Sequence, residues 1–147
     1  MNNLLITFLG ITYILILFMT KSKMSAKDQE SQRKTFSDVS NNLPENMSID
    51  SIIDKSKTPL KFVCYFITLI LICFYLGIAW YVSHPFVWIM AIIESVYSVT
   101  GYLIGLRKSK DLTAERLIQP EKPVQIYIKF AISSLFYLPA IWFLIVG

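Results

Sequence analysis

The chain has 147 residues, of which 54% are hydrophobic and 16% are charged, and its mean hydropathy is +0.53. The apolar residues are gathered into four long blocks, which argues against a single soluble domain. The formal charge of +4 does not indicate nucleic acid binding, because Phe36 is the one aromatic residue in the two predicted loops and the basic residues there are not interleaved with aromatic rings for stacking.

Each apolar block is about as long as the ~20 residues that cross a ~30 Å hydrocarbon core at 1.5 Å per residue. The short alternating strands of an outer-membrane barrel are absent from the sequence. We therefore predict an all-α integral membrane protein with one domain and four transmembrane helices. The predicted spans cover residues 3–20, 59–82, 85–106 and 123–146, joined by loops over 21–58 and 107–122.

The first block, MNNLLITFLGITYILILFMT, is followed at once by Lys21 and Lys23. A cleavable signal peptide carries its positive charge before the apolar run and has a small-residue cleavage site after it. Here the charge follows the run, so we expect the first span to be retained with its short N-terminus outside.

Basic residues are distributed unevenly between the two sides of the predicted bundle. All fourteen Lys and Arg lie between Lys21 and Lys129, in two short segments, whereas both tips and the connection at 83–85 carry none. The positive-inside rule then predicts that the N- and C-termini are outside and that both loops are cytosolic. The basic residues expected at the membrane surface are Lys21, Lys23, Arg107, Lys108 and Lys110.

The 21–58 loop holds two candidate helical segments. Ser25 is a suitable cap for a polar helix over 26–34, and Ser48 for an amphipathic turn over Ile49–Lys55. Two interpretations of the second segment stay open: a piece resting on the membrane or a partner, and a locally ordered part of a mobile loop. The glycosylation sequon at Asn46 faces the cytosol in this topology and is expected to stay unmodified.

Proline residues mark the expected helix starts. Thr58 and Pro59 are read as the cap and first residue of the second span, and Pro85 and Pro123 open the third and fourth. The tight Ser83-His84-Pro85 connection predicts an antiparallel hairpin of spans two and three. In the 107–122 loop, Asp111–Ile118 is expected to form a short interfacial helix.

The third span carries the one acidic residue that lies inside an apolar run, Glu94. On a helical wheel, a single arc collects the small and polar side chains, and the opposite side is made of Ile, Val and Leu. Small residues permit close helix approach in a membrane. We therefore expect helix packing at Ala91, Gly101 and Gly105, with Glu94 facing protein or water rather than lipid.

An acid at mid-helix costs roughly 2.5–3.5 kcal/mol by insertion scales, so protonation is its expected response. Two interpretations of Glu94 remain: a proton- or cation-coupled site, and a protonated acid that holds helices together by hydrogen bonds. Tyr137 is a further hydroxyl at similar depth. The predicted intramembrane polar site comprises Glu94, Ser95, Ser98, Ser133, Ser134 and Thr12.

Lys129 also lies within an apolar block, about 9 Å from the start of the fourth span at 1.5 Å per residue. It is close enough to the inner surface to snorkel, and a buried functional lysine is the alternative.

No enzyme signature was found. HExxH, GxSxG, a P-loop and GxGxxG are absent, and His84 lacks a cluster of metal ligands. Cys64 and Cys73 lie on opposite faces of one helix and read as small apolar residues. We expect no catalytic residue, no metal and no cofactor.

The expected function is non-enzymatic. The sequence favours a multi-pass protein of the bacterial cytoplasmic membrane that acts by interaction, as an accessory, immunity or regulatory subunit. The alternative is an oligomeric proton- or cation-coupled transporter or holin-like channel using Glu94, since one bundle of four short spans offers little room for a pathway. The expected partners are the lipid bilayer and another membrane protein or further copies of the chain, with no nucleic acid.

Overall fold

The computed structural model describes residues 1–44, 49–109 and 122–147, which form five helices. These are α1 (Asn2–Met24), α2 (Ala26–Asn41), α3 (Ile49–Val82), α4 (Pro85–Ser109) and α6 (Pro123–Val146). By length and composition, α1, α3, α4 and α6 can each cross a membrane. The prediction of an all-helical chain with four candidate spans is therefore confirmed.

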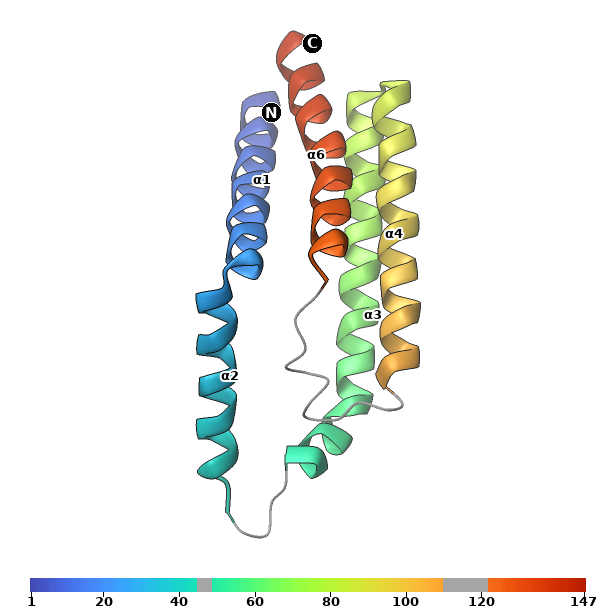
Figure 1. Cartoon of the computed structure of the whole chain (residues 1–147). Coiled ribbons are helices and arrows are strands. Elements are labelled where there is room, and N and C mark those ends of the chain that lie inside the picture. Colours follow the sequence, from blue (N-terminus) through green and yellow to red (C-terminus); the bar gives the residue numbers. More distant parts are fainter. Residues whose placement is uncertain (45–48, 110–121) are drawn as a thin grey trace.

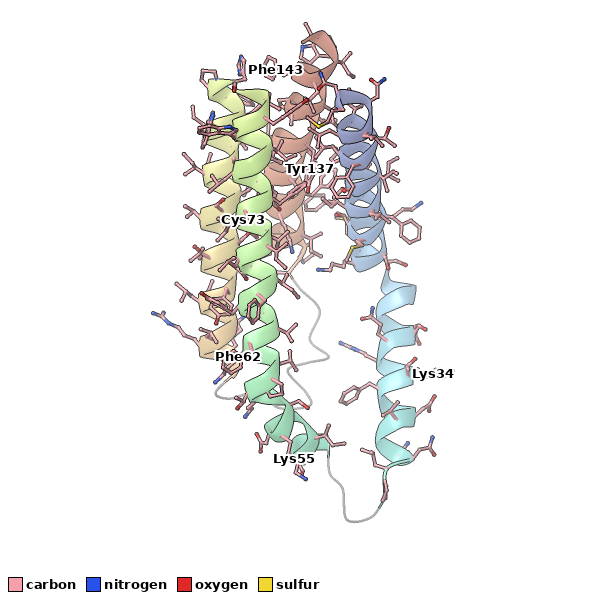
Figure 2. The ribbon with its side chains drawn as sticks, turned by 180° about the vertical axis from the view of Figure 1, so that it is seen from behind. Lys34, Lys55, Phe62, Cys73, Tyr137 and Phe143 are labelled. Atoms are coloured by element: carbon pink, nitrogen blue, oxygen red, sulfur yellow. The ribbon has the colours of Figure 1, made fainter. Side chains whose placement is uncertain are left out.

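The four long helices form an elongated bundle in which α6 lies between α1 and the antiparallel α3–α4 pair (Figure 1). Both termini lie at the end that carries the α3–α4 turn, which we call the hairpin end. The opposite end, which we call the basic end, carries Lys21 and Lys23 of α1 and Arg107 and Lys108 of α4. Lys34 and Lys55 lie beyond it, far from Phe143 (Figure 2).

The core follows α6 because this helix touches all the other spans. Its buried side chains include Phe136, Tyr137, Ala140 and Leu144, and they pack with Leu9 of α1 and with residues of α3 and α4. Large apolar side chains elsewhere on the spans are exposed, as expected for a bundle whose outer faces contact lipid.

Near the connection between α1 and α2, two helix boundaries differ from those predicted from the sequence. The first helix extends to Met24 rather than residue 20, because neither Gly nor Pro interrupts it and Lys21 and Lys23 suit the negative end of its dipole. It ends at Ser25, whose backbone is extended at φ −78° and ψ 118°. The polar helix expected over 26–34 continues to Asn41 as α2.

The expectation that the second apolar helix starts at Pro59, with Thr58 as its cap, is wrong. Helix α3 begins at Ile49, so the amphipathic turn over Ile49–Lys55 forms its first turns and Pro59 lies inside it. Proline in a helix interior removes one backbone hydrogen bond and favours a kink. Figure 1 shows the N-terminal segment of α3 bent from the axis of the rest. Pro59 is exposed, so water can satisfy the freed carbonyl group.

The α3–α4 turn is tight. Only Ser83 and His84 separate the two helices, and Ser83 adopts a left-handed backbone with φ 52°. The Ser83 N–H still donates to the Ala79 carbonyl at 2.9 Å, and this closes the end of α3. Helix α4 then extends to Ser109, three residues past the expected end of the third span.

Four sequence predictions lie outside the described residues. They are the sequon at 46–48, the helix cap at Ser48, the interfacial helix at 111–118 and the surface position of Lys110.

Candidate intramembrane polar site

Glu94 is buried on the face of α4 that turns towards the bundle. Val87, Met90, Ala91 and Glu94, at positions i, i+3, i+4 and i+7, are all buried, and Glu94 itself is 4% exposed. On the opposite side of α4, Ile89, Ile92, Ile93 and Val96 are exposed. The two-faced character of this helix therefore matches its packing in the bundle.

The Glu94 carboxyl lies within hydrogen-bonding reach of the Ser133 hydroxyl on α6. Its Oε1 atom has no hydrogen-bond partner among the described residues. Leaving a buried polar atom unpaired costs about 1–3 kcal/mol, and more where the group is charged.

Two tyrosine side chains interact with this carboxyl. Tyr75 on α3 and Tyr137 on α6 both interact electrostatically with Glu94 and with each other. The Tyr75 and Phe136 rings pack edge to face with centroids 5.0 Å apart. This aromatic packing fixes the orientation of Tyr75 and holds its hydroxyl near Glu94.

Helix α1 reaches the same region through Tyr13. The Tyr13 hydroxyl and the Ser134 Oγ are 3.0 Å apart, and the Tyr13 and Tyr137 ring centroids are 6.1 Å apart. Tyr137 is labelled in Figure 2, in the middle of α6. All four candidate spans thus contribute a polar group to one cluster at mid-bundle, which consists of Tyr13, Tyr75, Glu94, Ser133, Ser134 and Tyr137.

Two members of this cluster were missed from the sequence. Tyr13 and Tyr75 each lie near the middle of an apolar block, a position less usual for tyrosine than the membrane interface. This unusual depth was the sequence feature that could have identified Tyr13 and Tyr75 as members of the cluster. Their pairing with Ser134 and Tyr137 depends on helix rotation, which the sequence pattern leaves open.

Two residues of the predicted polar site, Ser95 and Thr12, form hydrogen bonds within their own helices. Ser95 Oγ donates to the Ala91 carbonyl at 2.7 Å, and Thr12 Oγ1 donates to the Phe8 carbonyl at 2.8 Å. Both bonds stay within one helix, where a backbone carbonyl four residues earlier is always in reach. Ser98 is half-buried on α4, one turn beyond Glu94.

Of the three residues predicted to pack against other helices, Ala91 is fully buried, whereas Gly101 and Gly105 are on the surface of the described bundle. Both glycines are exposed, and among the described residues no neighbouring helix comes within 4 Å of the Cβ position of either. The reason is helix length: the C-terminal end of α4 extends past the beginning of α6 (Figure 1). Among the described residues, Gly101 and Gly105 therefore lie on a part of α4 that α6 does not cover.

Lys129 is exposed on α6, one turn before Ser133, and it interacts electrostatically with Glu94. No ion pair joins it to Glu94 in the described part of the chain. The other predicted surface lysines and arginines, Lys21, Lys23, Arg107 and Lys108, are exposed at the basic end.

No cluster of three metal-ligating side chains occurs among the described residues. His84 instead contacts its own neighbours: Nδ1 accepts a hydrogen bond from the Phe86 N–H at 3.2 Å, and its ring stacks on Phe143.

Helix α2 projects from the bundle beyond the end of α1 (Figure 1). Its described side chains are exposed except for half-buried Phe36. Phe36 and Val39 are spaced i, i+3 and share one face, and Val39 is 55% exposed. We call Phe36 and Val39 the α2 apolar pair; sequence analysis had described only the polar character of this segment.

Comparison with protein-family models, with curated proteins and with solved structures finds no match to this chain.

Proposed function

We propose that this protein acts by interaction, as an accessory, immunity or regulatory subunit of a system in the bacterial cytoplasmic membrane. In this proposal the four spans anchor the chain, and α2 contacts the partner on the cytosolic side. The observation that carries the proposal is the projection of α2 from the bundle with Val39 exposed and Phe36 half-buried.

The physical argument concerns the stability of α2. A helix that is polar on nearly all sides and packs on little gains few tertiary contacts, and a 16-residue helix alone in water is marginally stable. A partner that covers Phe36 and Val39 supplies the missing burial. Three basic and three acidic residues give α2 a net charge of zero, so a protein surface fits it better than an anionic lipid surface.

A photocrosslinking residue at Gln32, which is exposed one turn before Phe36 on the same face of α2, tests this proposal in native membranes when it is introduced into the wild-type chain, Val39→Asp and Ser37→Asp. The expected result is a crosslinked protein that is recovered with the wild-type chain, is lost with Val39→Asp and is kept with Ser37→Asp. Ser37 is the matched control, because it is exposed on another face of α2. Equal recovery with both variants, or the absence of a crosslink, contradicts a role for this face.

The second candidate function is an oligomeric proton- or cation-coupled transporter or channel. It is favoured by one specific observation: the unpaired, buried Glu94 Oε1 atom beside hydroxyl groups from α3 and α6. Ionisable groups inside membrane spans frequently mark ion or proton pathways. The chain would need several copies, because its described pockets are apolar grooves rather than a polar passage.

Liposome flux separates the two functions. Purified protein is reconstituted, a pH or ion gradient is imposed, and Glu94→Gln is compared with wild type and with Glu30→Gln, an exposed acid on α2. Flux that disappears only in Glu94→Gln supports coupling. Absence of flux in all three proteins, with reduced stability of Glu94→Gln in detergent, supports a structural role for the carboxyl.

A further inference from the structure

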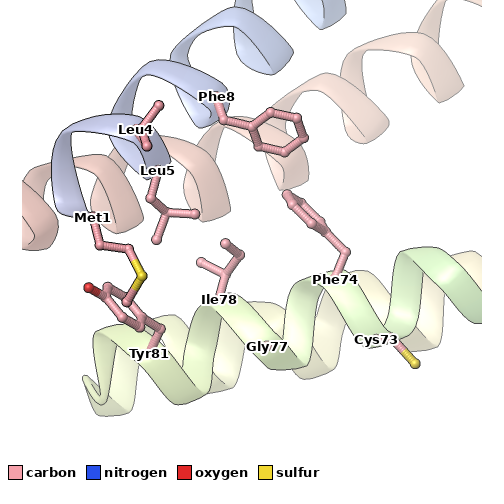
Figure 3. Close-up of a pocket in the computed structure, with 9 residues that line it drawn as sticks. All are labelled: Met1, Leu4, Leu5, Phe8, Cys73, Phe74, Gly77, Ile78 and Tyr81. Carbon is pink, nitrogen blue, oxygen red and sulfur yellow. The ribbon is translucent and has the colours of Figure 1, made fainter.

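An apolar groove of about 630 Å³ lies between α1 and α3 at the hairpin end (Figure 3). Leu4, Leu5 and Phe8 line it from α1, and Phe74, Gly77 and Ile78 from α3. Leu4 and Phe8 are 78% and 55% exposed, so the groove is open along its side. Because both helices are candidate spans, this opening faces the hydrocarbon of the bilayer.

The groove has two different ends. At the inner end, the Phe8 and Phe74 rings meet edge to face with centroids 6.0 Å apart. At the outer end, the Tyr81 hydroxyl donates a hydrogen bond to Asn2 Oδ1, which links α1 and α3 by a polar pair. The apolar groove therefore ends beside a polar pair, at the end where a lipid changes from acyl chain to headgroup.

The length of the groove distinguishes a lipid acyl chain from a partner's transmembrane helix as its occupant. Its lining extends from Met1 to Phe8 on α1 and from Cys73 to Tyr81 on α3, or about 10–12 Å at 1.5 Å per residue. One leaflet contributes about 15 Å of hydrocarbon, half of the ~30 Å core. A partner's transmembrane helix needs a surface along the whole core, and the Phe8–Phe74 contact interrupts the groove well before that.

The glycine at position 77 supports the groove as a binding site independently of the groove's length. Glycine in a helix interior costs roughly 0.5–1 kcal/mol relative to alanine. Close packing by another helix normally explains such a residue in a span, but the Cβ position of Gly77 has no described neighbour within 4 Å. A larger side chain here would fill the groove, so glycine at this position keeps the groove open.

We propose that this groove binds one acyl chain of a glycerophospholipid from the leaflet at the hairpin end. The chain lies along α1 and α3 down to the Phe8–Phe74 contact, and the Tyr81–Asn2 pair lies at the level of the glycerol and headgroup. Because Tyr81 and Asn2 are uncharged, this pair can form hydrogen bonds with the glycerol ester region of the lipid but no ion pair with its headgroup. This site is independent of the α2 surface and of Glu94.

Native mass spectrometry of the full chain tests the site. Delipidated protein in detergent is titrated with dioleoyl phosphatidylcholine, and wild type is compared with Gly77→Ala, Gly77→Leu and Gly10→Leu. Gly10 on α1 is a matched control, because its Cβ position is also open and it does not line the groove. We expect one lipid to bind wild type and Gly10→Leu equally, at least tenfold more weakly to Gly77→Leu, and with intermediate affinity to Gly77→Ala.

Equal lipid affinity in all four proteins would overturn the proposal. So would a dimer that Gly77→Leu converts to monomer while lipid binding is unchanged, since the groove would then hold a second copy of the chain. Gly77→Ala adds a single methyl group to open space, so it keeps the test valid if Gly77→Leu does not fold.

Discussion

The imidazole ring of His84 stacks on the ring of Phe143, with centroids 3.7 Å apart and 18° between the ring planes. The same imidazole accepts the Phe86 N–H through Nδ1. One side chain therefore caps the N-terminus of α4 and also joins the α3–α4 turn to α6. Sequence analysis had treated His84 only as a residue beside Pro85, with no tertiary role.

Substitution of His84 separates these two contributions. His84→Asn keeps a capping acceptor and loses the stacking, so we expect it to lower the free energy of unfolding by about 1 kcal/mol. His84→Ala loses both, with an expected loss of about 2 kcal/mol. Thermal or chemical unfolding in detergent measures both values. In a Phe143→Leu background, His84→Asn is expected to cost almost nothing; an undiminished cost would show that the stacking contributes no stability.

The pairing of Glu94 with Ser133 gives a second prediction. Ser133→Ala removes the hydroxyl within reach of a carboxyl that already has one unpaired oxygen, so we expect a loss of about 1–3 kcal/mol in stability. Ser98→Ala, a half-buried serine on α4, is the matched control, and we expect it to change the unfolding midpoint little. Similar losses for both serines would contradict a specific Glu94–Ser133 interaction.

The hydrogen bond between Tyr13 and Ser134 attaches α1 to α6. Tyr13→Phe removes the hydroxyl and keeps the ring contacts, so the expected loss is about 0.6 kcal/mol and at most about 1.7 kcal/mol, the range measured for hydrogen bonds between membrane helices. Tyr127→Phe, on the exposed side of α6, is the control. Proteolysis that releases α1 faster in Tyr13→Phe than in the control would locate the effect at this helix.

Orientation in the membrane is testable by cysteine labelling. Cys64 and Cys73 are free and exposed, so they are first replaced by alanine. We expect Ser83→Cys, in the hairpin turn, to react with a membrane-impermeant thiol reagent in intact cells, because both basic segments are predicted to be inside. Ser37→Cys on α2 is expected to react only after permeabilisation. The reverse pattern would show that the chain is inserted the other way.

The positions of the spans were predictable from the sequence because hydropathy is a local property. Twenty apolar residues in a row must form a helix in a bilayer, whatever the rest of the chain does. The burial of Glu94 was predictable for a related reason, since the exposed Ile and Val residues of α4 mark its lipid-facing side. The asymmetry of the basic residues is likewise visible in the sequence without any fold.

Other features depended on how the helices are rotated and offset against one another. The offset of α6 against α4 brings Ser133 to Glu94 and leaves Gly101 and Gly105 uncovered. The rotation of α3 turns Tyr75 towards Glu94, and its length carries Pro59 inside the helix. Outside α4, hydropathy constrains these two quantities weakly, because lipid and protein interiors are similarly apolar and side-chain packing decides the rotation. The sequence pattern thus determined which segments form apolar helices. The polar cluster and the groove depend on how these helices pack against one another.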